Sequence, residues 1–292
     1  MSRNVALDVH WGRFAAITTA TKLVSLLSTA GINVIGISHP DAKSIANLNF
    51  QDASDLDTCE AILVVGGDGT ILRGAEIART QQIPLLGINL GHVGFLAEAE
   101  PDALDVVVLA IVNRSWVLDP RLSLEVKVEF NNEIIWTSWA LNEISIEKAA
   151  EERIVELVTA IDDRPVSRYA GDGVVVATPT GSTAYAFSAG GPIVWPNVAA
   201  FVLVPLSAHA LFARPLVISP DSSVQIELMS KASAWADSRR GMELPAGSRI
   251  TITRSEQPVL LARMNAEPFT DRLVAKFDLP TNGWRGSAGS LN

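Results

Sequence analysis

The segment AILVVGGDGTILRGAEIAR, residues 61–79, decides how the first part of the chain folds. Its five leading apolar residues, 61–65, have the length and composition of a buried strand, and apolar spacing from Ile71 to Arg79 predicts a helix. Between them lies Gly66-Gly67-Asp68-Gly69-Thr70. Glycines let a ligand approach the backbone closely, and a helix N-terminus offers unpaired N–H groups to an anion. The turn is therefore a candidate phosphate site.

Asp68 is the charged residue of this turn, and two interpretations of it stay open. A carboxylate in an anion-binding turn is unfavourable unless it acts on a phosphate or beside one. Alternatively, Asp68 caps the helix or forms an Asx turn, which is common for aspartate beside glycine. The pentapeptide alone does not decide between a catalytic and a structural role.

Strand and helix patterns alternate on both sides of this segment as far as Trp116. The other expected helices and strands of this part are 21–30, 32–37, 83–88 and 102–112. Such alternation is typical of βαβ units around a mostly parallel sheet. We expect an N-terminal Rossmann-like α/β domain over residues 1–116.

From Leu122 the pattern changes to the two-residue period of half-buried strands. Residues 122–130 alternate apolar and polar side chains, and Asn131-Asn132 after them is a good hairpin turn. Further short strands are expected at 134–141, 154–161, 174–177, 224–228 and 250–253. Many short strands predict a C-terminal all-β, sandwich-like domain, which we assign to residues 117–273. The polar, glycine-rich segment 274–292 is expected to be a partly disordered tail.

Composition excludes several classes of protein. The 292 residues include 23 basic and 32 acidic ones, a net charge of −9, and no basic stripe for nucleic acid. No stretch of roughly 20 clean apolar residues predicts a membrane span, and the N-terminus lacks a signal-peptide pattern. The single cysteine, Cys59, excludes an internal disulfide. We expect a soluble cytoplasmic protein that binds neither nucleic acid nor membrane.

Two polar clusters lie within the expected β domain. Residues 171–192 run from Gly171-Asp172-Gly173 through the hydroxyl-rich loop TPTGSTAY to Gly190-Gly191-Pro192. Hydroxyls and amides at a strand end can contact ribose or phosphate, although an ordinary loop has the same composition. Asn142 and Glu143, at the end of an apolar strand, are poor β residues, which indicates either a binding role or a strand-terminal turn.

Together these clusters resemble the NAD kinase family. The resemblance extends from Ile62 to about Leu273, and its blocks are GGDGT at 66–70, GINLGHVGFL at 87–96, Asn142-Glu143 and the 171–192 cluster. A glycine–aspartate turn alone also occurs in 6-phosphofructokinases, diacylglycerol kinases and sphingosine kinases, whereas the four blocks in register are specific. The resemblance implies phosphorylation of the adenosine-ribose 2′-hydroxyl of NAD by ATP, or in some members by polyphosphate, to give NADP.

The resemblance also implies roles for individual residues. Asp68 would be the general base, and Gly66, Gly67, Gly69 and Thr70 would adjoin the donor phosphates, with Mg²⁺ held through those phosphates rather than by assignable side chains. The implied NAD contacts are Asp68, Gly69, Arg73, Asn142, Glu143, Arg153, Asp172, Thr183, Ala184, Tyr185, Ala186, Phe187 and Ser188. Asp172 would touch the far end of NAD in its own or a neighbouring subunit, since the family leads us to expect homodimers or homotetramers.

Each of these roles has a structural alternative. Arg153 follows two glutamates and could form a surface ion pair worth under about 1 kcal/mol. Tyr185 could fill a core, and Asp172 could be a turn residue. For the whole chain, the alternatives are a lipid or sphingoid kinase with the same turn and a non-catalytic NAD(P)-sensing protein. Residues 235–240 are similar to a family turn near NAD, and His92 and His209 are expected to be structural.

Overall fold

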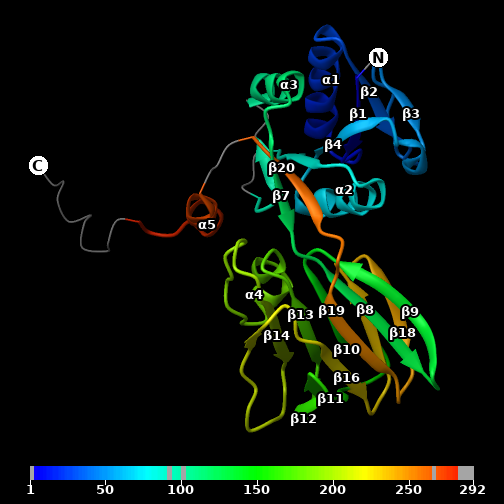
Figure 1. The fold of residues 1–292 in the computed structure, drawn as a ribbon, viewed down its shortest axis with the longest axis vertical. Coiled ribbons are helices and arrows are strands. Elements are labelled where there is room, and N and C mark those ends of the chain that lie inside the picture. Colours follow the sequence, from blue (N-terminus) through cyan, green and yellow to red (C-terminus); the bar gives the residue numbers. More distant parts are fainter. Residues whose placement is uncertain (1–2, 91–93, 100–102, 265–267, 282–292) are drawn as a thin grey trace, which may run out of the picture. The chain divides into compact units, whose positions relative to one another are not determined.

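The computed structural model describes residues 3–90, 94–99, 103–264 and 268–281 (Figure 1). The chain divides into two compact units, one formed by residues 1–120 and 260–292 and the other by 121–259. The first unit thus extends beyond the expected end at 116. Residues 260–273, expected in the second domain, also belong to the first unit, because the chain returns there to the sheet of that unit.

The first unit is built on an eight-stranded sheet. Its strands are β1 (Arg3–Val9), β2 (Ile32–Ile37), β3 (Asn49–Gln51), β4 (Cys59–Val65), β5 (Leu85–Ile88), β6 (Ala97–Ala99), β7 (Val117–Arg121) and β20 (Val259–Arg263). Their order is β3-β2-β1-β4-β5-β20-β7, with β6 paired to β5, and the pairs from β3 to β20 are parallel. The helices are α1 (Phe14–Thr29), α2 (Asp68–Gln81), α3 (Leu104–Asn113) and α5 (Phe269–Phe277), with a 3-10 turn at Ala53–Asp55.

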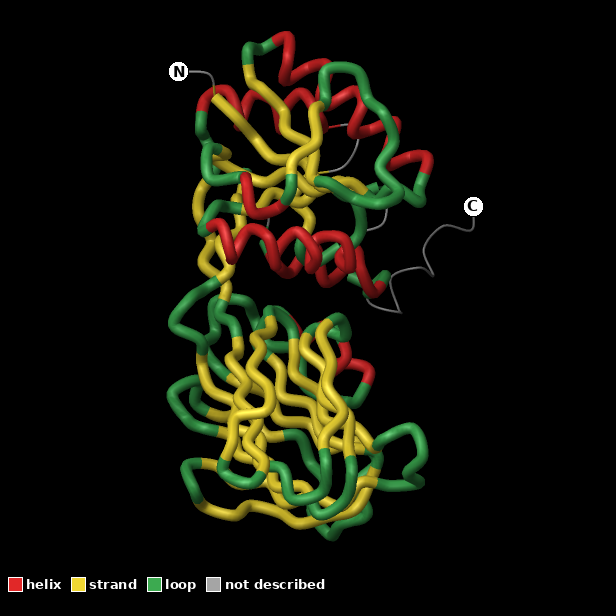
Figure 2. Tube along the Cα trace, turned by 90° about the vertical axis from the view of Figure 1, so that its right-hand side faces the viewer, coloured by secondary structure: helices red, strands yellow, loops and turns green. Residues whose placement is uncertain are grey.

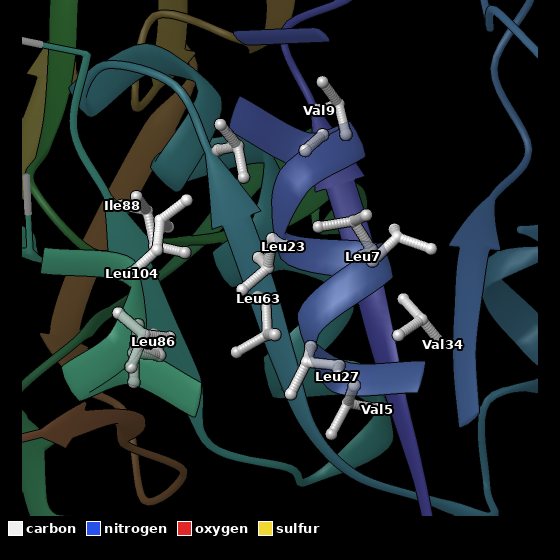
Figure 3. Packing of buried hydrophobic residues seen from close by; sticks show 14 of the residues in the cluster. Val5, Leu7, Val9, Leu23, Leu27, Val34, Leu63, Leu86, Ile88 and Leu104 are labelled. Atoms are coloured by element: carbon white, nitrogen blue, oxygen red, sulfur yellow. The ribbon is translucent and has the colours of Figure 1, made fainter. Parts of the chain in front are cut away.

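Helices pack on both faces of this sheet, against alternate side chains of β4. Leu63 packs with Leu23 of α1 in one core (Figure 3). Val65 belongs to the same core. On the other face Gly74 of α2 lies so close to Val64 that a Cβ there would overlap the valine side chain. Because α2 follows β4 directly and packs on it, the glycine-rich turn is fixed at the carboxyl end of β4. The expected Rossmann-like α/β domain is confirmed.

The second unit consists of two six-stranded antiparallel sheets (Figure 2). Their orders are β15-β14-β13-β10-β17-β18 and β12-β11-β16-β19-β8-β9. The strands are β8 (Leu124–Phe130), β9 (Glu133–Ala140), β10 (Glu143–Lys148), β11 (Val155–Ile161), β12 (Arg164–Gly171), β13 (Gly173–Ala177), β14 (Phe201–Leu206), β15 (Leu216–Ile218), β16 (Val224–Leu228), β17 (Ala232–Ala236), β18 (Arg240–Leu244) and β19 (Arg249–Arg254). Helical residues are the 3-10 turn η3 (Gly181–Thr183) and α4 (Tyr185–Ser188).

The alternation of apolar and polar residues from Leu122 onward matches the alternation of buried and more exposed side chains in this sandwich. Val126 and Val128 of β8 are fully buried and share one core with Ile144 and Ile146 of the other sheet. Asn131 and Asn132 have φ values of 52° and 65°, as a two-residue hairpin turn requires. The expected β-sandwich-like domain is confirmed.

The C-terminal segment differs from the expected loose tail. Residues 269–277 form α5, so the first residues of the expected tail, 274–277, are helical. Residues 282–292 lie outside the described part of the chain. Within the described ranges, no helix is long and apolar enough to cross a membrane.

Candidate active site

Asp68 is the first helical residue of α2, and the N-cap is Gly67. The carboxylate therefore does not occupy the N-cap position, which excludes helix capping as its structural role. Its Oδ1 is buried and makes no hydrogen bond with the described residues. Burying a carboxylate oxygen without a partner is costly, so this atom is suited to meet a ligand group.

The glycines around Asp68 serve two purposes. A Cβ on Gly66 would lie 2.5 Å from Oγ1 of Thr70, so close packing excludes a side chain there. At Gly67 and Gly69 a Cβ would meet no atom within 4 Å, which leaves the backbone open to a ligand. Since the first N–H groups of α2 have no acceptor within the helix, the turn retains its predicted capacity for an anion.

Gly94 lies directly against the Asp68 carboxylate. A Cβ at this position would be 2.6 Å from Oδ1 of Asp68, which is far inside van der Waals contact. Gly94 belongs to the 87–96 block of the resemblance. Residues 91–93 of that block lie outside the described residues, so the expectation for His92 stays a prediction.

Arg73 forms a bidentate ion pair with Asp8, at the end of β1. Its Nε lies 3.0 Å from Oδ2 and its Nη2 lies 2.6 Å from Oδ1 of Asp8, which is buried. Nη2 also donates to the Val9 carbonyl at 2.9 Å. This geometry ties α2 to β1. Contact between Arg73 and NAD stays a prediction, and it would have to leave this pair intact or replace it.

In the second unit, Asn142 and Glu143 lie where β10 meets the hydroxyl-rich loop. Thr178 N–H donates to the Asn142 carbonyl at 2.9 Å, and its Oγ1 donates to the Leu141 carbonyl at 2.6 Å. The Glu143 carboxylate lies close to the backbone of Tyr185. Thr178 and Leu141 are 37 residues apart in the sequence, so this hydrogen bond joins the two clusters into one structural site.

Gly181 shows how closely this loop approaches the strand. A Cβ there would overlap the carbonyl oxygen of Asn142 and lie 2.6 Å from its Cα. We expect Gly181→Ala to displace the Asn142 backbone, lower the unfolding free energy by about 1–3 kcal/mol and raise the KM for NAD. Urea unfolding and initial rates measure both effects. An alanine variant with wild-type stability and KM would contradict this account.

Asp237 holds the backbone of this site from the turn between β17 and β18. Its Oδ1 accepts the N–H of Asn142 at 2.7 Å, with Glu143 N at 3.4 Å, and its Oδ2 accepts the N–H of Leu141 at 2.9 Å. Nη2 of Arg240 lies 3.1 Å from Oδ2 and completes the set. In the sequence, only the family resemblance places this turn near NAD. The structure shows that Asp237 supports the backbone of Asn142.

Arg240 is fixed on its other sides as well. Nη2 donates to the carbonyl of Trp139 at 2.6 Å, and the guanidinium lies 4.5 Å from the centre of the Trp139 ring. Such cation–π contact holds the charge in place. Trp139 thus helps to position the counter-charge of Asp237.

Burial controls the protonation of Glu143. Desolvation, with a further contribution from the negative charge of Asp237, raises the pKa of Glu143 to about 8. Burial likewise raises the pKa of Asp237. Glu143 is therefore mostly protonated at neutral pH and can donate a hydrogen bond. Its Oε2 and Oδ1 of Asn142 are buried without partners among the described residues, as atoms that await a ligand would be.

This protonation makes stability depend on pH. The unfolded carboxyl ionises near 4.5, whereas folded Glu143 keeps its proton up to about 8. Unfolding then releases a proton between these values, so the unfolding free energy falls as the pH rises, by at most about 1.4 kcal/mol per unit. We expect Glu143→Gln to lessen this fall. Urea titrations at several pH values measure it, with the exposed Glu133→Gln as control; equal slopes in both variants would refute the assignment.

The other predicted contacts are more exposed. Lys148 pairs with Asp172 at 2.6 Å, and this hydrogen bond is the main cause that lowers the pKa of Asp172. Desolvation raises the pKa of Tyr185, assisted by the charges of Glu147, Asp172 and Glu143. Arg153 is exposed and pairs with no described residue. From Thr183 to Ser188, only Ala186 is fully buried.

In the described ranges, no three or more His, Cys, Asp or Glu side chains are grouped so that they could hold a metal ion. The expectation that Mg²⁺ is held through the donor phosphates stays a prediction.

Comparison with known proteins identifies the family. The model of the ATP-NAD kinase N-terminal domain matches residues 18–116, and that of the C-terminal domain matches residues 141–264. The chain is 50% identical to "NAD kinase 2" of Streptomyces coelicolor, over 98% of this chain and 97% of that protein. The chain belongs to the NAD kinase family.

Further NAD kinase relatives extend the match. The "NAD kinase" of Mycobacterium leprae is 47% identical over 97% of both chains. A yeast NADH kinase crystallised with NADH has a TM-score of 0.83 at 25% identity. The match covers 99% of this chain and 89% of the yeast chain. An Archaeoglobus fulgidus NAD kinase crystallised with ATP has a TM-score of 0.71 at 25% identity. This match covers 95% of this chain and 99% of the archaeal chain. This chain is accordingly an enzyme of the NAD kinase family, which sets aside the lipid-kinase alternative.

Proposed function

We propose that this enzyme transfers the γ-phosphate of ATP to the 2′-hydroxyl of the adenosine ribose of NAD and releases NADP and ADP. The buried, unpartnered Oδ1 of Asp68 is the observation that carries the proposal. Asp68 accepts the hydroxyl proton as the ribose oxygen bonds to phosphorus and the bond to ADP breaks. The archaeal relative crystallised with ATP supports ATP as the donor, although polyphosphate suits the same open turn.

The two units supply different groups in this proposal. The open backbone of Gly67 and Gly69, with the first N–H groups of α2, stabilises negative charge on the donor phosphates. Mg²⁺ bound to those phosphates supplies additional charge neutralisation. In the second unit, Asn142 and Glu143 offer unpartnered oxygens to the adenosine part of NAD. The loop from Thr183 to Ser188, with Arg153 and Asp172, extends the contact with the dinucleotide.

We also infer a cytoplasmic homo-oligomer, a dimer or a tetramer. Its single cysteine suits a reducing compartment. Large apolar side chains are exposed at Leu211, Phe212 and Val217, in and beside the loop that precedes β15. Such side chains favour burial against another copy. Light scattering on the pure protein measures the mass and tests this inference.

The direct test is an assay for NADP. Pure protein is incubated with NAD, Mg²⁺ and either ATP or polyphosphate, and each reaction is repeated with NADH as the acceptor. NADP formed with ATP supports the proposal. If no phosphorylated dinucleotide forms with either donor, the proposed reaction is wrong.

A further inference from the structure

Helix α5 packs on the segment that contains Gly94. The rings of Phe269 and Phe277, at its two ends, have centroids 5.7 and 6.0 Å from that of Phe95. Arg272, between them, is only 6% exposed, which is unusual for arginine. The helix therefore covers the 94–99 segment with both apolar and charged groups.

Arg272 binds this segment at three points. Its Nη1 donates to the carbonyl of Ala97 at 3.0 Å and lies 3.3 Å from that of Phe95, and its Nη2 donates to Oε1 of Glu98 at 2.6 Å. Glu98 also pairs with Arg263 at the end of β20. A buried guanidinium with this many acceptors fixes the geometry of the backbone it contacts.

The same segment touches the proposed catalytic carboxylate. Gly94 adjoins Phe95, and its Cα lies so near Asp68 that a Cβ would be 2.6 Å from Oδ1. Ala99, at the other end, accepts the N–H of Asn89 at 2.7 Å, which attaches the segment to β5. The segment is thus held at one end by the sheet and along its length by Arg272.

We propose that Arg272 of α5 is a positioning residue for phosphoryl transfer, which holds Gly94 against Asp68 and so sets the orientation of that carboxylate. This proposal rests on the proposed function. Without the guanidinium, the carbonyls of Phe95 and Ala97 lose their donor and the backbone at Gly94 can move away. A displacement of about 1 Å in a reacting group can cost on the order of 100-fold in rate.

The test compares Arg272→Ala with Lys276→Ala, which removes an exposed cation from the same helix. We expect Arg272→Ala to lower kcat about tenfold or more while the KM for NAD changes less than about threefold. Lys276→Ala should match the wild type. Hydrogen exchange should accelerate at 94–99 and in the first turn of α2 in Arg272→Ala alone.

A double variant separates positioning from general weakening. Gly94→Ala already displaces the carboxylate. The fold-loss of kcat in the double variant should therefore be smaller than the product of the fold-losses in the two single variants. Multiplicative losses, or wild-type kcat in Arg272→Ala, would overturn the proposal. If the alanine variant does not fold, Arg272→Lys replaces it, and reduced kcat at unchanged KM is then required. If the wild type forms no NADP, the proposed function fails, and exchange at 94–99 still tests whether Arg272 holds that segment.

Discussion

Asp68→Asn is expected to lower kcat for NADP formation by about 10²- to 10⁴-fold while the KM for NAD stays within a few-fold. Asparagine keeps the shape of the side chain and its oxygen, but it cannot take the proton of the ribose hydroxyl. The loss falls on the chemical step because the open turn and the first-turn N–H groups of α2 are unchanged.

Initial rates over a range of NAD concentrations measure this effect. Asp105→Asn is a matched control, because Asp105 is an exposed first-turn aspartate of another helix, α3, in the same unit. Removing a first-turn charge costs only about 0.3–1 kcal/mol, so neither variant should unfold. An Asp68→Asn enzyme with more than half the wild-type kcat would disprove the assignment of the base.

Local patterns in the sequence predict most elements of both units, since apolar period and turn residues act over short distances. The alternation from Leu122 to Phe130 predicts β8, and the glycine–aspartate turn predicts the junction of β4 and α2. The start of α1 is missed by seven residues, because its N-cap, Arg13, makes no capping side-chain bond that the sequence could indicate.

Elements that depend on distant pairing are not predictable in this way. β1 contains Asp8 and begins with Arg3 and Asn4, and its pairing with β2 and β4 makes it a strand. β20 belongs to the first sheet because Leu261 pairs with Leu85, far away in sequence. No local signal in the sequence reveals such partners. The expected second domain therefore ends at residue 273, whereas the observed second unit ends at 259.

The same distinction holds for the site. Residue types and glycines indicate Asp68, Asn142 and Glu143, whereas the supporting contacts join residues that are far apart along the chain. Asp237 binds the N–H of Asn142 across a separation of 95 residues, and Arg272 reaches Ala97 across 175. The chemical groups are therefore visible in the sequence, and the groups that position them become visible only in the fold.

Asp237→Ala is expected to lower the unfolding free energy by about 3–5 kcal/mol and to weaken binding of NAD. The substitution leaves the N–H groups of Leu141 and Asn142 without their acceptor, and Arg240 loses its counter-charge beside the Trp139 ring. Breaking a buried pair costs that much because the remaining charge is uncompensated. Urea unfolding followed by tryptophan fluorescence, with KM for NAD, measures both.

The control must account for backbone strain, since Asp237 has a φ of 52°. Asp163, in the hairpin between β11 and β12, is exposed and has a φ of 61°. Asp163→Ala therefore removes a carboxylate at a left-handed position without touching the site, and should cost only about 1–2 kcal/mol. Equal losses in the two variants would mean that strain, and not the support of Asn142, explains the effect.

Asp237→Asn separates the charge of this residue from its role as an acceptor. Asparagine tolerates the left-handed conformation, but its amide N–H₂ must face one of the N–H donors that the carboxylate accepts. We expect a smaller loss of stability than in Asp237→Ala. Because the negative charge of Asp237 contributes to the raised pKa of Glu143, that pKa should fall from about 8 in this variant, although burial still keeps it above its ordinary value. The fall of stability with pH should then end at a lower pH than in the wild type, and an unchanged end point would show that Asp237 does not influence Glu143.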